Sequence, residues 1–355
     1  MGFALLCAAC AGPVAQLPGV SPDEVSAEKR RQEIVQFQTI AAQSTRVGNV
    51  AHRLMVANRS DCENAVAPRL GWQAFSRMDL DPPAREIAAE ALQLDAQRPT
   101  IVTLVESGPA ARAGLSPGDV LTAINGEPIP SSKSSNWVAE RVHRNGSAPL
   151  RVEFLRRGVP QTRSVEPEMG CAIPVFLTTN QGTNALTDGK RIVVYSGVLR
   201  LAQSDAELAA VVAHEFAHVT MRHIQKGERN RVAGMLGGFI GGLAMDFKAG
   251  FDAGLRGELP GEAKNTREIM QGKAFAMDFE READYVGLYY VARAGYDIAG
   301  AERIWRALAQ ENPRQIFYSG LHPTTPERVI LLQKTAQEIA EKKRHNQPLV
   351  PETRS

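Results

Sequence analysis

The segment HEFAH at residues 214–218 constrains this 355-residue chain most, because a helix places two histidines four residues apart on the same face. A helix start is expected upstream, where Ser204 and Glu207 have the spacing of a capping box. The helix is predicted to continue to about Lys226. Both imidazoles then lie on one helical face, one turn apart, and can bind the same metal ion.

This pattern is typical of a catalytic zinc site with one ion per chain. His214 and His218 would be ligands, and Glu215, turned by about 100° around the helix, would lie beside the ion. Its carboxylate can then act as general base toward the attacking water, while zinc polarises the scissile carbonyl. The alternative is a pair of helix histidines with a purely structural role.

A catalytic zinc needs a third protein ligand and an open position. One known solution requires a glycine at position 221 and a histidine at position 224, but the chain has Met221 and Ile224 there. His223 does not fit this spacing and is expected to be a surface residue. The other known solution takes a glutamate from a later helix.

A helix predicted over about residues 272–294 offers that glutamate, in the run FEREAD at 279–284. Glu280 and Asp284 are four residues apart, so Glu280 can reach the metal while Asp284 accepts a hydrogen bond from a ligand histidine. Gly287 on the same face would let the two helices approach closely. The alternative is a solvated run of charges, and the residues alone leave it open.

The remaining pattern predicts an α+β fold with more than one domain, since 43% hydrophobic residues can bury a large core. The expected elements are a long amphipathic helix at 24–58, strands at 173–178 and 192–195 around a loop at 180–190, and helices at 299–311 and 325–343. The net charge of +2 comes from basic residues scattered among acidic ones. No electrostatic footprint for nucleic acid is therefore expected.

Residues 1–20 resemble an export or lipoprotein leader, since a short apolar run precedes Pro18 and a charged helix. The run is too short to span a bilayer and lacks the basic residues that usually precede it. Cys10 follows Ala8 and Ala9 as the acylated cysteine of a bacterial lipoprotein does. Lipidation at Cys10 and plain secretion are both kept as interpretations.

Export would give the other two cysteines a use, because an exported protein is in a compartment that permits disulfides. Cys62 and Cys171 lie just before and just after a segment of different texture, so a bridge would close its base. Two unrelated buried thiols are the alternative. The glycine-rich stretch 234–257 is interpreted as a mobile flap or a membrane contact.

HEFAH and EREAD, with the strand-loop-strand before them and LHP at 321–323 followed by Arg328, resemble the HtpX, BepA and CAAX-prenyl-protease family of gluzincin peptidases. The resemblance covers about residues 24–58 and 171–343. It implies a mainly helical zincin-like domain with a small β-sheet over 171–345, in which Glu280 binds zinc. It also implies that His322 and Arg328 lie near the metal, with His322 steadying the oxyanion or occupying the open position.

The same resemblance implies how a substrate binds. Members of this family take a protein chain as an added strand at a sheet edge above the zinc, here around Asn184, Ala185 and the strand 192–195. Backbone pairing of this kind gives affinity without demanding a particular sequence. Broad protein substrates are therefore expected.

Residues 102–127, VTLVESGPAARAGLSPGDVLTAINGE, resemble the PDZ domains of bacterial envelope proteases. A PDZ-like β-sandwich or barrel is expected over 66–167, inserted between an N-terminal helix at 24–62 and the peptidase domain. Leu70, Gly71 and Trp72 resemble the loop whose amides bind a C-terminal carboxylate. A structural turn is the alternative for this loop.

Together these features favour a zinc endopeptidase of the bacterial periplasm that acts on misfolded or misassembled envelope proteins. Acylation of Cys10 would tether it to the outer membrane, and the PDZ-like domain would recruit or gate substrates. The competing interpretation is a non-catalytic chaperone or assembly factor, against which the general base Glu215 argues. An integral-membrane protease is disfavoured because no apolar stretch of 18 residues is found.

Overall fold

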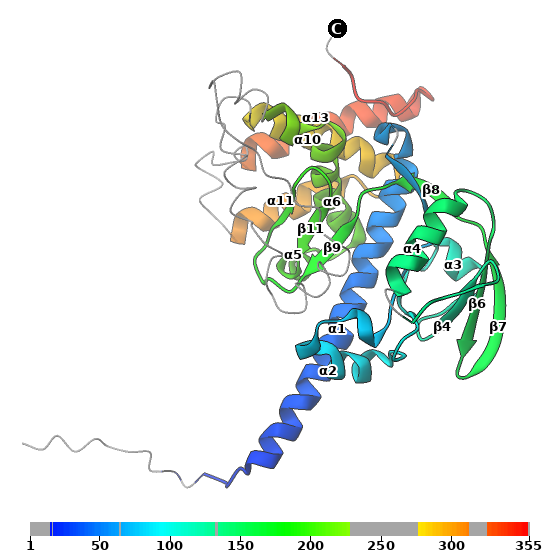
Figure 1. Ribbon diagram of the computed structural model, residues 1–355. Helices are drawn as coiled ribbons and strands as arrows, with labels where there is room; N and C mark the ends of the chain where they lie inside the picture. The colour runs from blue at the N-terminus through cyan, green and yellow to red at the C-terminus, as the bar shows by residue number, and fades with distance from the viewer. Residues whose placement is uncertain are drawn as a thin grey trace, which may run out of the picture.

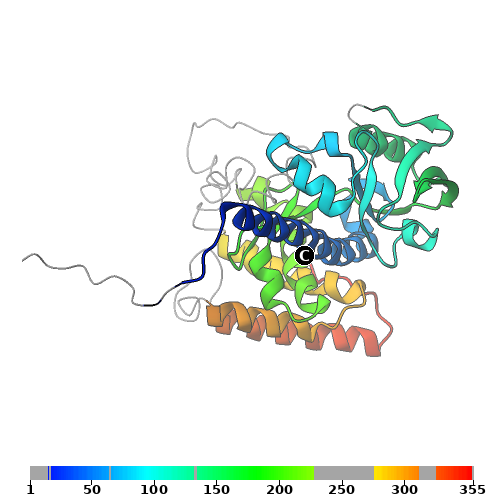
Figure 2. The same cartoon turned by 90° about the horizontal axis from the view of Figure 1, so that it is seen from below.

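The computed structural model describes residues 15, 17–63, 65–131, 134–227, 276–311 and 325–353. Its longest element is helix α1 (Pro22–Ala57), which runs between a mainly helical body and a smaller β-rich body (Figures 1 and 2). Cys10, the stretch 234–257 and His322 lie outside the described residues. The α+β fold class is confirmed.

Helix α1 forms where the periodicity predicts it. Ser21 is the N-cap, and the capping box is complete: Glu24 N donates to Ser21 Oγ at 3.2 Å, and Ser21 N donates to the Glu24 carboxylate at 2.8 Å. Val50, Leu54 and Met55 in its C-terminal half are fully buried. Both bodies therefore pack against this half of α1.

The helical body contains a small three-stranded sheet and five described helices. The strands β9 (Val175–Thr178) and β11 (Ile192–Tyr195) are parallel neighbours, and β10 (Ala185–Thr187) pairs antiparallel with β11. The helices are α5 (Ser196–Leu201), α6 (Asp205–Thr220), α10 (Ala276–Arg293), α11 (Ala299–Glu311) and α13 (Thr325–Arg344). The loop expected at 180–190 thus holds an edge strand, too short to show in the sequence pattern.

Helices α6 and α10 pack closely against each other. A Cβ added to Gly287 of α10 would lie 3.2 Å from the backbone of Ala213 on α6. A side chain there would push the helices apart, so the glycine has the close-approach role expected of it. Phe216, Tyr289 and Tyr290 fill the core around this contact.

The β-rich body is inserted through a two-stranded antiparallel tether, β1 (Val66–Arg69) and β8 (Glu168–Cys171). The short helix η1 (Arg59–Cys62) precedes the tether, and a disulfide joins Cys62 to Cys171. The bridge lies at the base of the insertion. It links the end of α1 to the point where the chain re-enters the helical body.

The insertion has its own sheet and its own core. Its strands are β2 (Trp72–Phe75), β3 (Thr100–Leu104), β4 (Val120–Ile124), β5 (Glu127–Pro128), β6 (Leu150–Arg156) and β7 (Val159–Val165), in the order β2-β3-β4-β6-β7 with β5 beside β4. Its helices are η2 (Arg77–Asp79), α2 (Pro82–Leu92), α3 (Pro109–Arg112) and α4 (Ser134–Asn145). Leu121 and Phe154 centre a hydrophobic cluster separate from that of the helical body.

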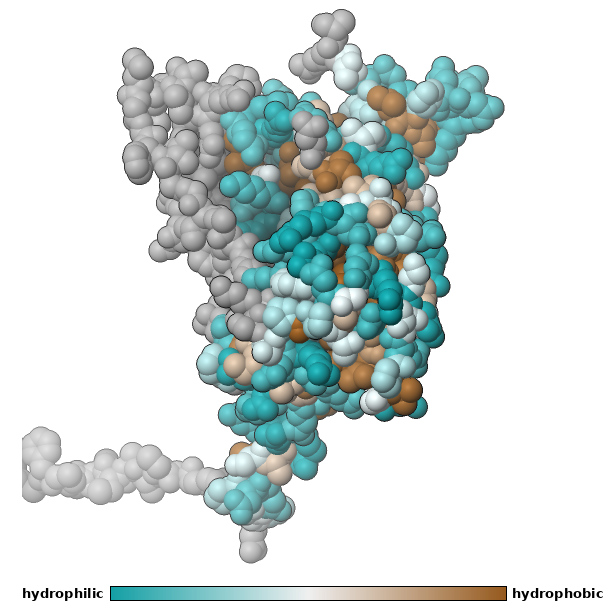
Figure 3. Space-filling model, turned by 45° about the vertical axis from the view of Figure 1, so that its right-hand side comes forward, coloured by the Kyte–Doolittle hydropathy of each residue, from teal (hydrophilic) through white to brown (hydrophobic). Residues whose placement is uncertain are grey.

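The face drawn in Figure 3 is largely hydrophilic, with hydrophobic residues in small separate patches. Within the described ranges, no helix combines the length and the apolar character that crossing a membrane requires.

Candidate metal centre

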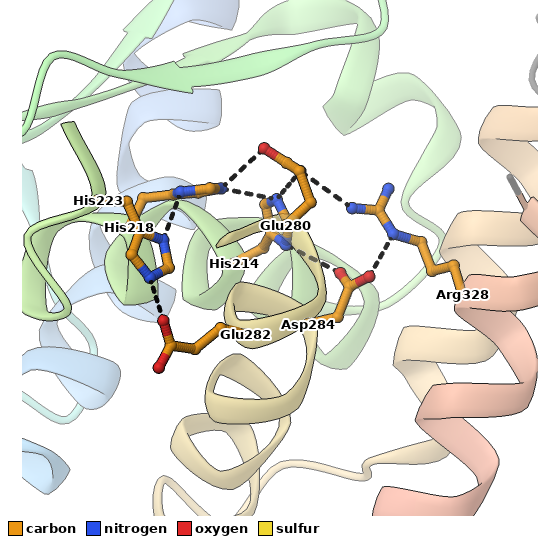
Figure 4. A network of polar contacts seen from close by, with 7 residues as sticks. All are labelled: His214, His218, His223, Glu280, Glu282, Asp284 and Arg328. Atoms are coloured by element: carbon orange, nitrogen blue, oxygen red, sulfur yellow. Dashed lines mark hydrogen bonds and ion pairs between the residues drawn. The ribbon is translucent and has the colours of Figure 1, made fainter. Parts of the chain in front are cut away.

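Helices α6 and α10 bring two histidines and a glutamate together (Figure 4). His214 Nε2 lies 3.2 Å from His218 Nε2, and the two oxygens of Glu280 lie 3.2 Å from His214 Nε2 and 3.3 Å from His218 Nε2. All three side chains are buried, with at most 2% of each residue exposed. Their ligand atoms converge on one point from two helices that cannot easily separate.

These separations fit a divalent metal. Ligands about 2.0–2.1 Å from a tetrahedral ion are separated from one another by roughly 3.3–3.4 Å. The observed spacings match that value, and two imidazoles with one carboxylate are a donor set found in catalytic zinc sites. His214, His218 and Glu280 could therefore hold one metal ion and leave a position open.

Asp284 and Arg328 support the His214 side of the cluster. His214 Nδ1 lies 2.9 Å from Asp284 Oδ1, and Arg328 Nε donates to Asp284 Oδ2 at 2.7 Å. Arg328 is also stacked over the Trp305 ring at 3.8 Å. The solvated-charge alternative is wrong for Glu280 and Asp284, which are 0% and 3% exposed.

Burial and hydrogen bonding compete in setting the charges here. Burial disfavours the charged form of His214, but hydrogen bonds to Asp284 and Glu280 outweigh it and raise the pKa of His214 to about 9. Burial likewise opposes ionisation of Asp284. Arg328 and His214 overcome it and hold the pKa of Asp284 below its ordinary value. Without a metal, the cluster is therefore an ion-pair network.

The prediction that His223 lies on the surface is wrong. His223 is 2% exposed, its Nδ1 lies 2.9 Å from His218 Nδ1, and its Nε2 lies 2.8 Å from a Glu282 oxygen. Burial keeps the pKa of His223 below its usual value. The prediction assumed a helix that continues to about Lys226, whereas α6 ends at Thr220 and the chain turns before His223.

Helix α6 ends at Thr220 rather than continuing to Lys226. Arg222 has a φ of 56°, in the left-handed region, and the chain turns before a new helical stretch begins at 223. The turn folds His223 back under His218. At the other end, Ser204 Oγ accepts from Glu207 N at 3.3 Å, but the Glu207 carboxylate accepts from Gln203 N, so the capping box is only half formed.

Glu215 and the edge strand complete the surroundings of the cluster. Glu215 follows His214 on α6 and is 8% exposed. Strand β10 packs against α6, and Asn184 O just before it accepts from Tyr195 N at 3.0 Å. Ala185 is the first residue of β10, whose only partner among the described strands is β11. One backbone edge of β10 is thus unpaired among the described strands, and it lies next to α6, the helix that carries His214 and His218.

The loop of Leu70, Gly71 and Trp72 lies at the start of β2. Gly71 has a φ of 77°, and a Cβ there would be 3.0 Å from the Val105 side chain, so both conformation and space require glycine. Leu70 O accepts from Ala110 N at 2.9 Å, which ties the loop to the domain core. All three loop residues line a cavity of about 470 Å³.

Comparisons with known proteins agree with this architecture. The Peptidase family M48 model matches residues 175–336, and a PDZ domain model matches residues 100–156. Mitochondrial metalloendopeptidase OMA1 of Arabidopsis thaliana is 31% identical over 144 residues, covering 40% of this chain and 27% of that protein. The beta-barrel assembly-enhancing protease of Escherichia coli K12 is 35% identical over 124 residues, covering 34% and 25%.

These matches span about a quarter of the length of each curated relative. Among solved structures, the HtrA3 PDZ domain bound to a phage-derived ligand is similar, with 19% identity and a TM-score of 0.23, covering 29% of this chain and 88% of that one. The resemblance inferred from HEFAH, EREAD and the glycine-punctuated insertion is confirmed. The chain combines a peptidase domain of family M48 with a PDZ domain.

Proposed function

We propose that this chain is a zinc-dependent endopeptidase that cleaves misfolded or misassembled proteins of the bacterial envelope. The observation that carries the proposal is the convergence of His214, His218 and Glu280, with Glu215 next in sequence to a ligand. A structural metal site has four protein ligands and no need of a general base. Three ligands and a neighbouring carboxylate are what a catalytic site needs.

The roles of the residues follow from their positions. A bound zinc ion would polarise the scissile carbonyl and make the attacking water more acidic. Glu215 takes the proton from that water and passes it to the leaving amine. Asp284, held by Arg328, fixes the ring of His214 so that its Nε2 faces the cluster. We assign His322, on the family resemblance of its LHP motif, to stabilisation of the oxyanion.

The substrate chain is proposed to bind at β10. An extended segment can pair with the open side of this strand, near Asn184 and Ala185, and continue past the cluster on α6. Such pairing uses backbone groups of the substrate. It therefore suits an unfolded protein chain of varied sequence.

An oxidising compartment fits the disulfide between Cys62 and Cys171. The periplasm is the bacterial compartment of that kind, and lipidation of Cys10 would tether the protein to the outer membrane. The PDZ domain would bind a tail of the client and raise its local concentration at the zinc.

The proposal is tested with Glu215→Gln, which removes the base and keeps the shape of the side chain. We expect zinc content to equal that of the wild type and casein cleavage to fall by a factor of about 10² to 10⁴. Metal analysis and a casein assay on the same preparations measure both. Equal cleavage by the variant would show that the site is not catalytic and would favour the chaperone alternative.

A further inference from the structure

A third buried imidazole, that of His223, adjoins the metal cluster without being one of its three ligands (Figure 4). Its side chain is 1% exposed, and its Nδ1 lies 2.9 Å from Nδ1 of His218. The other ring nitrogen of His218, Nε2, is the one that lies near Glu280 and His214. His223 therefore contacts the ligand histidine on the side that faces away from the metal position.

The two ligand histidines are supported by different groups. His214 Nδ1 lies 2.9 Å from a carboxylate oxygen of Asp284, whereas His218 Nδ1 lies against the imidazole of His223. Metal-binding histidines commonly donate their other ring hydrogen to a carboxylate, a backbone carbonyl or a water molecule. An imidazole in that place can accept only through a nitrogen that carries no hydrogen, so it must be held in one tautomer. The support of His218 thus needs a further group behind it.

Glu282 is that further group. One of its carboxylate oxygens lies 2.8 Å from His223 Nε2. A neutral His218 that offers Nε2 to a metal carries its hydrogen on Nδ1 and donates it to His223 Nδ1. His223 then carries its own hydrogen on Nε2 and donates it to Glu282. The hydrogen bonds run in one direction, from the ligand to the carboxylate.

The turn after α6 brings the His223 ring to this place. The helix ends at Thr220, and Arg222 has a φ of 56°. Left-handed backbone is unfavourable for a side chain such as arginine and persists where the surrounding structure fixes it. Here Arg222 forms an ion pair with Glu63. A straight continuation of the helix would instead turn residue 223 by about 140° away from His218.

Helix α10 holds the face of the His223 ring. Phe279 stacks on it with 4.7 Å between the ring centroids and 16° between the ring planes. Phe279 and Glu282 lie on either side of the third ligand, Glu280, in the sequence of this helix. His223 thus contacts a ligand of α6 and the neighbours of a ligand of α10. Its position depends on both helices that form the cluster.

We infer that His223 is a positioning residue: it fixes the ring of His218 with Nε2 toward the metal, and Glu282 fixes the tautomer of His223. The inference deepens the proposed function, since it rests on the metal site of that proposal but not on peptidase activity. Removal of the partner behind a metal-binding histidine typically lowers metal affinity about 10- to 100-fold. A histidine that merely fills the core would instead act through its volume and its stacking.

Two substitutions of His223 separate the hydrogen bond from the packing. His223→Asn keeps an acceptor oxygen near the place of Nδ1 but loses the ring, whereas His223→Phe keeps a ring that can stack on Phe279 but has no acceptor. We expect the Zn²⁺ affinity of the full chain to fall about 10- to 100-fold in His223→Phe and by a factor of at most about three in His223→Asn. Chelator competition measures both. The exposed His345 provides a control, His345→Ala, which should match the wild type.

Spectroscopy on the metal-loaded protein reports the orientation of His218 directly. The visible spectrum of bound Co²⁺ should shift in His223→Phe and stay close to that of the wild type in His223→Asn. In the Zn²⁺-loaded wild type, the ring ¹⁵N chemical shifts should place the hydrogen of His218 on Nδ1 and that of His223 on Nε2. The chain has seven histidines, so single-histidine variants suffice to assign these signals.

Glu282 allows a test that leaves the buried ring in place. Its side chain is 39% exposed, so Glu282→Gln should fold as the wild type does. The amide oxygen can still accept from His223 but has no charge, and we expect Zn²⁺ affinity to fall by a smaller factor, about three to ten. Asp278→Asn removes a charge from a side chain of the same helix that is 69% exposed, and it should leave the affinity unchanged.

Several outcomes would contradict this role. Zn²⁺ affinity of His223→Phe within about twofold of the wild type would show that the acceptor is not needed. A larger loss in His223→Asn than in His223→Phe would show that His223 acts by packing, as would equal affinities of Glu282→Gln and the wild type. The melting temperature of each metal-free variant checks its fold, and Glu282→Gln decides if His223→Phe is unfolded.

Failure of this inference can be told apart from failure of the proposed function. Full casein cleavage by Glu215→Gln would remove the peptidase proposal and leave the role of His223 standing, because none of these measurements needs peptidase activity. A wild-type chain that binds no Zn²⁺ would instead remove the metal site and the role of His223 together.

Discussion

The metal cluster and the interdomain groove, the cavity lined by β2, α4 and α1, both hold charged side chains that are fully or partly buried, but they differ in what balances the charge. In the cluster, Arg328 pairs with Asp284 and Asp284 with His214, so opposite charges meet within the chain. In the groove, the Arg69 guanidinium has no carboxylate among the described residues. The charges of the cluster are therefore balanced within the chain, whereas the charge in the groove has no counter-charge among the described residues.

Their supports differ as well. The cluster is on two helices in contact through Gly287, inside one hydrophobic core. The groove lies where two domains with separate cores meet. Anything that loosens the domain joint should affect the groove first and the cluster last.

The largest expected effect on this comparison comes from the disulfide. Cys62 and Cys171 are 109 residues apart, and closing a loop of that size stabilises the folded chain by about 4–5 kcal/mol in the chain-entropy model. We expect Cys62→Ser with Cys171→Ala to lower the free energy of unfolding in urea by about 2–5 kcal/mol. Peptide affinity of the groove should fall while zinc affinity is retained. Equal losses of peptide affinity and zinc affinity would contradict the expected difference between the groove and the cluster.

Removal of a ligand should affect the cluster alone. Zinc sites bind with about 10–16 kcal/mol in all, so one ligand in four is worth roughly 3–4 kcal/mol. Glu280→Gln should weaken zinc binding by a factor of about 10² to 10³, measured by chelator competition. Peptide binding in the groove should be unchanged. A parallel loss of peptide affinity would show that the two regions are more strongly coupled than their separate cores suggest.

The pH dependence of the free energy of unfolding of the metal-free protein should reflect the ion pairs of the cluster. The pKa of His214 rises from 6.5 to about 9 on folding, so protonation stabilises the fold fully below pH 6.5, and this contribution is lost as the pH rises through 9. Urea unfolding of chelator-treated protein should therefore show stability falling by on the order of 3 kcal/mol between pH 6 and pH 10. Asp284→Asn removes a carboxylate that raises the pKa of His214, so the stability of this variant should depend less steeply on pH. A rise in stability over this range would refute the assignment.

The smallest effect is expected at the groove wall. Gly48 is in the middle of α1, where alanine is favoured over glycine by about 0.5–1 kcal/mol, and nothing lies closer than 3.9 Å to an added Cβ. Gly48→Ala should raise the free energy of unfolding by that amount, as urea titration can show. A lower free energy of unfolding for Gly48→Ala would show that the groove has no room for a methyl group at this position.

The sequence located most of the cluster because its chemistry repeats at helical spacing. His214 with His218, and Glu280 with Asp284, are each one turn apart, and a straight helix puts such pairs on one face. The PDZ insertion was equally visible, since its glycines mark turns that other residues rarely adopt. His223 was not, because its burial depends on a turn at Met221 and Arg222 that no periodicity reveals.

The sequence alone thus determined which residues could bind a metal, that two domains are present, and that one is inserted in the other. Local spacing and turn chemistry suffice for these features. Only the tertiary structure decided that His223 lies under His218, that α1 lines the PDZ groove, and that Arg69 is partly buried there with no counter-charge among the described residues. Those features depend on where separate elements meet in space, and no local pattern in the chain records that.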